Sequence, residues 1–249
     1  TTAARVIACD VRADRLTTLE RELGIRVSAD PTSADVVVLA VKPQQMSEAL
    51  AAWRPKQTGK ELVISIAAGI PTSRIERELG GRPRVVRVMP NTPALVGAGA
   101  SALCRGAYAT EDDLACAEFI MRAVGIVVRV DESLMDAVTA LSGSGPAYVF
   151  HLAEALMAAG EAQGLDAATA RELTVQTIWG AARLLRESGR NAAELREQVT
   201  SPGGTTAAAL AVFRERGLME IYREAVAAAT RRGRELAASG AASSHQGPK

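Results

Sequence analysis

The chain has 249 residues, which is enough for one large domain or two smaller ones. Lys and Arg number 29 against 28 Asp and Glu, so the net charge is +1 and gives no indication of nucleic-acid binding. No apolar run reaches the ~18 residues of a membrane span, so we expect no membrane-spanning helix.

The cysteines are few and widely spaced. Cys9, Cys104 and Cys116 form no CxxC pair, which predicts neither a disulfide framework nor a zinc site, and we expect no metal. We expect reduced thiols that pack as small hydrophobic side chains. This use of cysteine is typical of a reducing, cytoplasmic setting.

The first half of the chain alternates short β-branched runs with amphipathic stretches. Leu16, Leu19 and Leu23 share one helical face, and Gly24 follows as a C-cap. The alternation predicts βαβ units and a parallel, doubly wound sheet. The expected strands are 5–9, 35–41, 62–66, 84–88, 98–104 and 126–130, and the expected helices are 12–23, 43–53, 72–79 and 111–123.

After Asp131 the β-branched runs end and alanine-rich helices replace them. Much of this half is apolar around most of each helix, so we expect a partner subunit to cover it. The expected domains are an α/β domain at 1–131 and a helical domain at 132–240, followed by a disordered tail at 241–249. The expected helices are 146–163, 167–187, 192–199, 206–215 and 218–238.

Two short segments follow predicted strands, where a doubly wound fold binds its ligands. Ala40-Val41-Lys42-Pro43 is either a generic strand-to-helix turn or a loop that lies along a cofactor. In Met89-Pro90-Asn91-Thr92-Pro93, two prolines stiffen a loop that carries hydrogen-bonding side chains. That combination favours a functional role for the second segment.

Two more segments open predicted helices. Ser142-Gly143-Ser144-Gly145-Pro146 places Pro146 at a first helical position, with Ser144 or Gly145 as the cap, and this suits a plain helix start as well as a site. Ser201-Pro202-Gly203-Gly204-Thr205-Thr206 joins two glycines to a helix N-terminus, which favours an anion. Because the loop has no lysine, a carboxylate is a better candidate than a phosphate.

These segments, in this order, resemble the pyrroline-5-carboxylate reductase family. MPNTPALVGAG (Met89–Gly99) and DAVTALSGSGPAYVF (Asp136–Phe150) resemble its signature, VTSPGGTTAAAL (Val199–Leu210) its substrate loop and AVKP its cofactor loop. The resemblance implies a Rossmann-like α/β N-terminal domain and an all-α C-terminal dimerisation domain. It also implies reduction of 1-pyrroline-5-carboxylate to L-proline with NAD(P)H, the last step of proline biosynthesis.

The resemblance also implies the roles of individual residues. The substrate carboxylate would bind to Ser201, Gly203, Gly204, Thr205 and Thr206, with the catalytic Thr206 hydroxyl near the ring nitrogen. Interlocked homodimers, assembled as a pentamer of dimers (a decamer), would let this loop complete the partner's site. The cofactor would lie on Asp10, Arg12, Ala40, Val41, Lys42, Pro43, Asn91 and Thr92.

The choice between NADPH and NADH stays open in the sequence. Asp10 lies where an acidic residue usually binds the ribose hydroxyls of NAD, but it is also a candidate cap for the helix at 12–23. Arg12 and Arg15 follow closely and suit a 2′-phosphate. NADPH is the expected cofactor, with NADH as the alternative.

The start of the chain departs from the family pattern. The first strand and its GxGxxG-type loop are absent, so we expect a fragment or an altered start. That departure supports one alternative function: a non-catalytic or truncated paralogue that acts as a dimeric binding protein. A β-hydroxyacid or prephenate dehydrogenase is a weaker alternative, since the region after Asp131 has no lysine before Lys249.

Overall fold

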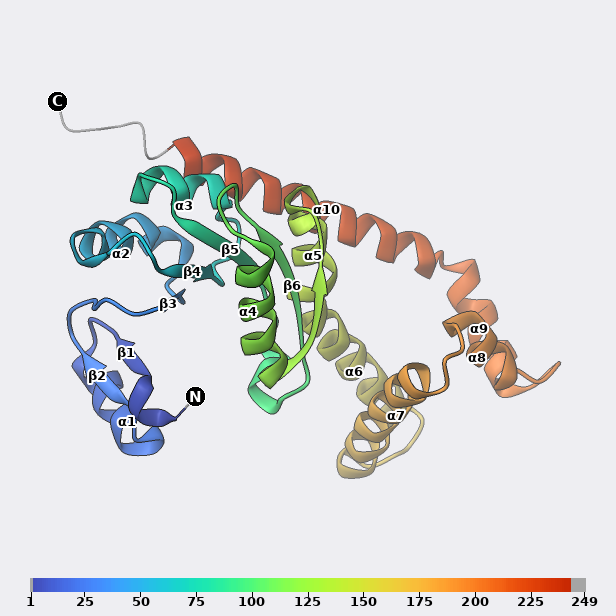
Figure 1. The fold of residues 1–249 in the computed structure, drawn as a ribbon. Helices are drawn as coiled ribbons and strands as arrows, with labels where there is room; N and C mark the ends of the chain where they lie inside the picture. The colour runs from blue at the N-terminus through green and yellow to red at the C-terminus, as the bar shows by residue number, and fades with distance from the viewer. Residues whose placement is uncertain (1, 243–249) are drawn as a thin grey trace. The chain divides into compact units, whose positions relative to one another are not determined.

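The computed structural model describes residues 2–242 (Figure 1). The chain forms two compact units. The first contains Thr1–Gly143 and the segment from Thr230 onward, and the second contains Ser144–Ala229. Within the described residues, no helix is long and apolar enough to cross a membrane. No cluster of His, Cys, Asp and Glu side chains between residues 2 and 242 is arranged to hold a metal ion.

The first unit is built on two sheets. Strands β1 (Ile7–Cys9) and β2 (Arg26–Ser28) form a parallel pair, joined by helix α1 (Ala13–Leu23). Gly24 ends α1 with a φ of 61°, which confirms its predicted capping role. The second sheet has the order β3-β4-β5-β6-β7, with strands Val36–Leu39, Leu62–Ser65, Arg84–Met89, Gly99–Arg105 and Gly125–Arg129.

The prediction of a parallel sheet is wrong at one strand pairing, between β5 and β6. Strands β3, β4 and β5 are parallel, but β6 runs antiparallel to β5, with Met89 opposite Ala102. Residues 90–98 are too few for a parallel crossover, which needs a dozen or more residues, so the chain turns back. Helix α4 (Glu111–Met121) then connects β6 to the parallel strand β7.

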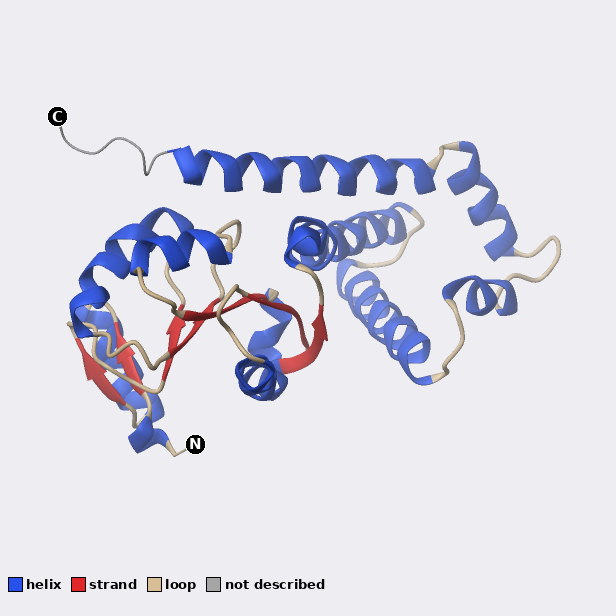
Figure 2. Cartoon of the chain, turned by 45° about the horizontal axis from the view of Figure 1, so that its top comes forward, coloured by secondary structure: helices blue, strands red, loops and turns tan. Residues whose placement is uncertain are grey.

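Helices cover both faces of the larger sheet (Figure 2). On one face, α2 (Met46–Trp53) and α3 (Thr72–Leu79) bury Met46, Leu50 and Ile75 against Val63 and Val85. On the other face, Leu114 and Ala117 of α4 pack on Ile64, Val86 and Leu103. Successive strand residues therefore face opposite cores, as a strand buried on both sides requires.

A connecting segment of short helical turns follows β7. It comprises α5 (Met135–Val138) and one turn of π-helix (Thr139–Gly143), neither of which the sequence predicted. Met135 is fully buried against Ala102 and Cys104 of the sheet. The segment thus packs within the first compact unit before the long helices begin.

The second unit consists of helices that bury few of their apolar side chains. Among its described residues only Ala170 and Thr174 are buried. Phe150, Trp179 and Phe213 are 64%, 55% and 47% exposed, respectively. The helices are α6 (Gly145–Ala162), α7 (Ala167–Glu187), α8 (Ala192–Gln198), α9 (Thr205–Glu215) and the first part of α10 (Leu218–Ala242).

Some sequence expectations change at the level of single residues. Cys104 is buried and Cys116 partly buried, but Cys9 is exposed, so the prediction that all the thiols are packed is wrong for Cys9. Helix α10 extends to Ala242, beyond its expected end at 238. The remainder of the predicted disordered tail, 243–249, lies outside the described residues.

Candidate functional site

The carboxyl ends of β3, β4 and β5 lie along one edge of the sheet, because these strands are parallel. Ligands of open α/β sheets bind at such an edge. Residues 40–43 follow β3 and residues 90–93 follow β5, so the structure brings two of the predicted segments to the same edge.

The loop after β4 lies between these two segments, and the sequence interpretation missed it. It comprises residues 66–71, with Gly69 at a φ of 71°, and the buried Ser65 hydroxyl accepts a hydrogen bond from Ala67 N–H at 3.4 Å. The sequence pattern that could have identified this loop is an apolar strand followed by small residues and a glycine. The residues Ala67-Ala68-Gly69 let a ligand approach the backbone closely.

The loop after β3 presents exposed groups. Ala40 and Lys42 are exposed, whereas Val41 and Pro43 are half-buried. Pro43 opens a 3-10 turn (Pro43–Gln45), and Lys42 C=O accepts from Gln45 N–H at 2.9 Å. The proline thus fixes the turn into α2 while the Lys42 side chain remains accessible.

The turn after β1 contains Asp10, Arg12 and Arg15. Asp10 is not the cap of α1: its Oδ1 accepts from Arg12 N–H at 2.9 Å, and Arg12 itself occupies the N-cap position without a side-chain cap bond. The carboxylate of Asp10 lies 3.5 Å from Nε of Arg15. Arg12 pairs with Asp14 at 2.6 Å, and this hydrogen bond raises the pKa of the Arg12 guanidinium. The charge of Asp10 is therefore partly compensated.

Asn91 links three separate pieces of chain. Its Oδ1 accepts from Ala100 N–H at the start of β6 at 2.9 Å, and its Nδ2 donates to Ser142 C=O at 3.2 Å. Thr92 is exposed and begins a 3-10 helix (Thr92–Val96), on which Leu95 and Val96 are 91% and 81% exposed. The structure thus joins the second and third predicted segments.

The fourth segment, residues 201–206, belongs to the second compact unit. Gly203 has a φ of 69°, and Gly204 is the N-cap of α9 with its N–H bonded to Ser201 C=O at 3.1 Å. Thr205 and Thr206 occupy the first turn of α9, where backbone N–H groups have no acceptor within the helix. Ser201 and Thr205 are exposed and Thr206 is half-buried, so this turn offers donors to a small anion.

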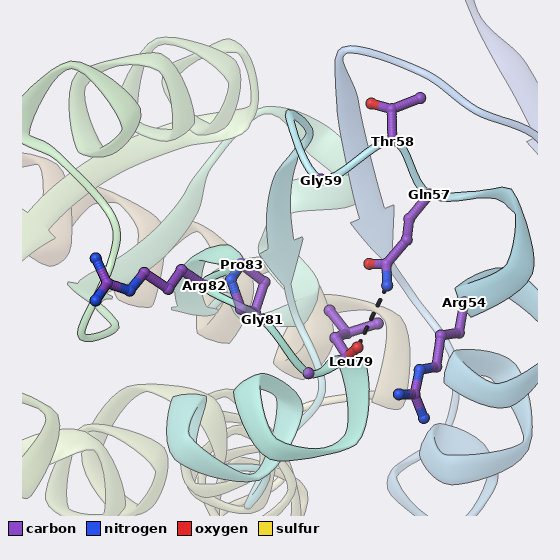
Figure 3. A pocket seen from close by; sticks show the side chains of 9 residues that line it. Arg54, Gln57, Thr58, Gly59, Leu79, Gly81, Arg82 and Pro83 are labelled. Atoms are coloured by element: carbon purple, nitrogen blue, oxygen red, sulfur yellow. Dashed lines mark hydrogen bonds between the residues drawn. The ribbon is translucent and has the colours of Figure 1, made fainter.

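A cavity of about 320 Å³ lies elsewhere in the first unit (Figure 3). Its lining precedes β4 and β5, so it lies at the amino ends of these strands, opposite the edge described above. Gln57 Nε2 donates to Leu79 C=O at 3.3 Å within it. The cavity does not coincide with the candidate site. Its lining residues are Arg54, Gln57, Thr58, Gly59, Leu79, Gly80, Gly81, Arg82 and Pro83.

The third predicted segment contains no serine-hydrolase arrangement. His151 lies on α6 with a side chain that is 85% exposed, and its nearest acidic partner is Glu154 at 3.4 Å. Ser144 occupies the N-cap position of α6 without a side-chain cap bond. The geometry of this segment is therefore that of a helix start preceded by a π-helical turn.

Comparison with known proteins gives consistent matches in both halves. Residues 132–236 match the family model for pyrroline-5-carboxylate reductase dimerisation, and residues 2–69 match that for NADP oxidoreductase, coenzyme F420-dependent. A pyrroline-5-carboxylate reductase of Methanosarcina acetivorans is 44% identical, covering 94% of this chain and 88% of the relative. One from Pseudomonas aeruginosa is 45% identical with the same coverage.

Solved structures agree in fold. A pyrroline-5-carboxylate reductase from Coxiella burnetii matches with a TM-score of 0.88 and 42% identity over 94% of this chain and 89% of that one. The Plasmodium falciparum pyrroline carboxylate reductase with NADP bound matches with a TM-score of 0.82 and 28% identity, over 93% and 87% of the chains. The Rossmann-like domain and the helical domain are thereby confirmed, and the chain belongs to the pyrroline-5-carboxylate reductase family.

Proposed function

We propose that the chain reduces 1-pyrroline-5-carboxylate to L-proline with hydride from NADPH, as the last step of proline biosynthesis. The observation that carries the proposal is 44% identity to a curated pyrroline-5-carboxylate reductase across 94% of the chain. The alternative of a non-catalytic paralogue is not favoured, because the match extends through both domains.

The residues present fit a nicotinamide dinucleotide. The carboxyl ends of three parallel strands form the edge where such cofactors bind, and Ala40, Lys42 and Thr92 are exposed there. When bound, the cofactor supplies a hydride from nicotinamide C4. We assign Asp10, Arg12, Ala40, Val41, Lys42, Pro43, Asn91 and Thr92 to its binding region.

NADPH is the favoured cofactor because of the turn after β1. Arg15 compensates the charge of Asp10, which would otherwise repel a 2′-phosphate, and the Arg12 guanidinium lies on the same exposed turn. A relative in this family has NADP bound. NADH remains compatible, since Asp10 is also suited to ribose hydroxyls.

The substrate carboxylate binds to the turn at 201–206. Gly203 and Gly204 let the anion approach the backbone, and the first N–H groups of α9 point toward it. Ser201, Thr205 and Thr206 add hydroxyl groups, and Thr206 donates or accepts at the ring nitrogen. The chemistry requires little acid–base machinery, because a hydrogen bond at the imine nitrogen already makes the ring carbon electrophilic.

The assembly is a homodimer formed through the helical domain, further arranged as a pentamer of dimers, in the cytoplasm. The family match over residues 132–236 and the exposed apolar side chains of α6, α7 and α9 support the dimer. In this arrangement the turn at 201–206 completes the site of the partner. Sedimentation as a monomer at micromolar concentration would contradict the assembly.

The decisive experiment removes the Thr206 hydroxyl. Thr206→Ala should lower kcat/KM by about ten- to a thousand-fold, as expected for one hydrogen bond to a polar or charged group. Thr206→Ser, which retains the hydroxyl, serves as the matched control and should recover most of the rate. Wild-type kinetics in Thr206→Ala would remove Thr206 from the mechanism, and a wild-type chain that fails to reduce the imine would refute the function itself.

A further inference from the structure

We propose that Asn91, which lies in the region assigned above to the cofactor, acts there as a positioning residue: it fixes the π-helical turn Thr139–Gly143 beside the loop at 90–93 and does not itself contact the cofactor. The proposal rests on the function proposed above. It starts from the side-chain amide, whose two ends both bond within the protein. The oxygen accepts from Ala100 N–H at 2.9 Å and the nitrogen donates to Ser142 C=O at 3.2 Å.

The second bond reaches a segment that arrives from the opposite edge of the sheet. Because β7 is parallel to β6 and β6 is antiparallel to β5, β7 ends at the edge where β5 begins. Residues 130–143 return across the sheet, with Met135 buried on Ala102 and Cys104. Ser142 therefore lies at the carboxyl end of β5 only because this segment has crossed the sheet.

The turn has an uncommon backbone conformation. Thr139–Gly143 is π-helical, a geometry that is rare in proteins and occurs often at functional sites. Thr139 Oγ1 donates to Met135 C=O at 2.8 Å and so occupies one carbonyl of the preceding turn. A side-chain donor from outside the helix, such as that of Asn91, helps to hold such a turn in one position.

Gly143, the residue after Ser142, packs against the side chain of Met89. A Cβ at Gly143 would collide with Cε of Met89, so the Met89 side chain lies directly against the Gly143 backbone. Met89 and Asn91 flank Pro90 and contact consecutive residues of the turn. The loop after β5 and the π-helical turn are thus held together by one hydrogen bond and one close packing contact.

This arrangement has a kinetic consequence. The loop at 90–93 belongs to the region that we assign to the cofactor, and it follows the last of the three parallel strands, farthest from the turn after β1. If the nicotinamide lies at this end, a shift of the turn changes the geometry of hydride transfer. Displacements of about 1 Å lower rates by up to ~100-fold while leaving distant binding contacts intact. Loss of the Asn91 donor should therefore lower kcat and spare cofactor affinity.

The first test removes the amide without adding a charge. Asn91→Ala loses both the donor to Ser142 C=O and the acceptor for Ala100 N–H. We expect kcat to fall by about 10- to 100-fold, with the Kd for NADPH, measured by protein fluorescence, changed less than about threefold. Ser142→Ala is the matched control, because it removes only the hydroxyl contact at 3.5 Å and should leave kcat within about threefold of wild type.

A second test uses the packing contact and does not depend on Asn91→Ala folding. Met89→Ala removes the side chain that lies against the Gly143 backbone, so it should lower kcat while sparing the Kd for NADPH. Gly143→Ala is the control, because its methyl group displaces only the terminal Cε of the flexible Met89 side chain. Unchanged kcat in Met89→Ala would count against the proposal.

The outcomes separate the two hypotheses. An Asn91→Ala chain with normal kcat, or one whose main defect is a higher Kd for NADPH, overturns the positioning role. In both cases an active wild type leaves the proposed function standing. A wild type that does not reduce the imine refutes the proposed function instead.

Discussion

Glu132 is the acidic partner of a nearly enclosed guanidinium: its Oε1 lies 3.2 Å from Nη1 of Arg87, whose side chain is only 5% exposed. The same carboxylate accepts from the N–H and hydroxyl of Thr72 at the start of α3, at 2.8 and 2.7 Å. Nη2 of Arg87 has no hydrogen-bond partner among the described residues. One carboxylate therefore compensates a buried charge and caps a helix.

We expect Glu132→Gln to destabilise the fold. The amide keeps an acceptor for Thr72 but leaves the Arg87 charge without a counter-ion. Loss of one partner of a fully buried pair costs about 3–5 kcal/mol, and since Glu132 is 31% exposed we expect roughly 2 kcal/mol in the free energy of unfolding. Urea denaturation measures it. Glu187→Gln, in an exposed pair with Arg183, is the control and should change stability by under ~0.5 kcal/mol.

Cys104 gives a prediction for alkaline pH. Burial, and then the nearby Glu132 charge, raise the pKa of its thiol from 9.0 to about 12. Between these values the unfolded chain releases a proton that the folded chain retains, so the free energy of unfolding falls as pH rises. The difference in stability between wild type and Cys104→Ala should shrink from pH 9 upward. A pH-independent difference would contradict the raised pKa.

The same burial predicts thiol reactivity. The exposed Cys9 should react with a thiol reagent in the native protein, whereas Cys104 should react only after unfolding. Mass spectrometry of the labelled peptides distinguishes the two sites.

Gly203 provides a test of the proposal that the turn at 201–206 binds the substrate carboxylate. Its φ of 69° strains any other residue, although an added Cβ would meet no atom within 4 Å. Gly203→Ala should therefore shift the turn and raise the KM for the imine by about tenfold, from the loss of roughly 1.4 kcal/mol of binding. Gly189→Ala is matched, with a φ of 67° and equally open surroundings in the α7–α8 connection, and should leave KM unchanged.

Arg15 allows the cofactor preference to be tested. Arg15→Ala removes the group that compensates Asp10, so kcat/KM with NADPH should fall by about tenfold while that with NADH changes much less. Arg21→Ala, on the same helix and paired with Glu22, is the control. Equal losses with both cofactors would show that Arg15 does not act on the 2′-phosphate.

Local signals predicted the helices well. Helices α3 (Thr72–Leu79) and α7 (Ala167–Glu187) have the expected bounds, since a proline or a capping Asp166 marks their start and a glycine follows closely at their end. The reversed direction of β6 could also have been predicted from the sequence, because the connection between β5 and β6 is too short for a parallel crossover.

Other features depend on contacts distant in sequence. Asn91 and Ser142 are 51 positions apart, and no local pattern marks either of them as the partner of the other. Arg87 would be expected at the surface of a strand, but Glu132, 45 positions away, permits its burial. Met89 and Asn91 lay within a predicted loop, yet their packing roles follow only from the path of residues 130–143.

The reversal of β6 limits how far a ligand can extend along the sheet. Past β5, the edge presents the first residues of a strand, and Ala100 N–H there is already bonded to Asn91. A dinucleotide that begins at the turn after β1, as we propose, would therefore end at residues 90–93. Its reach along the sheet would then be set by the direction of β6 rather than by any single side chain.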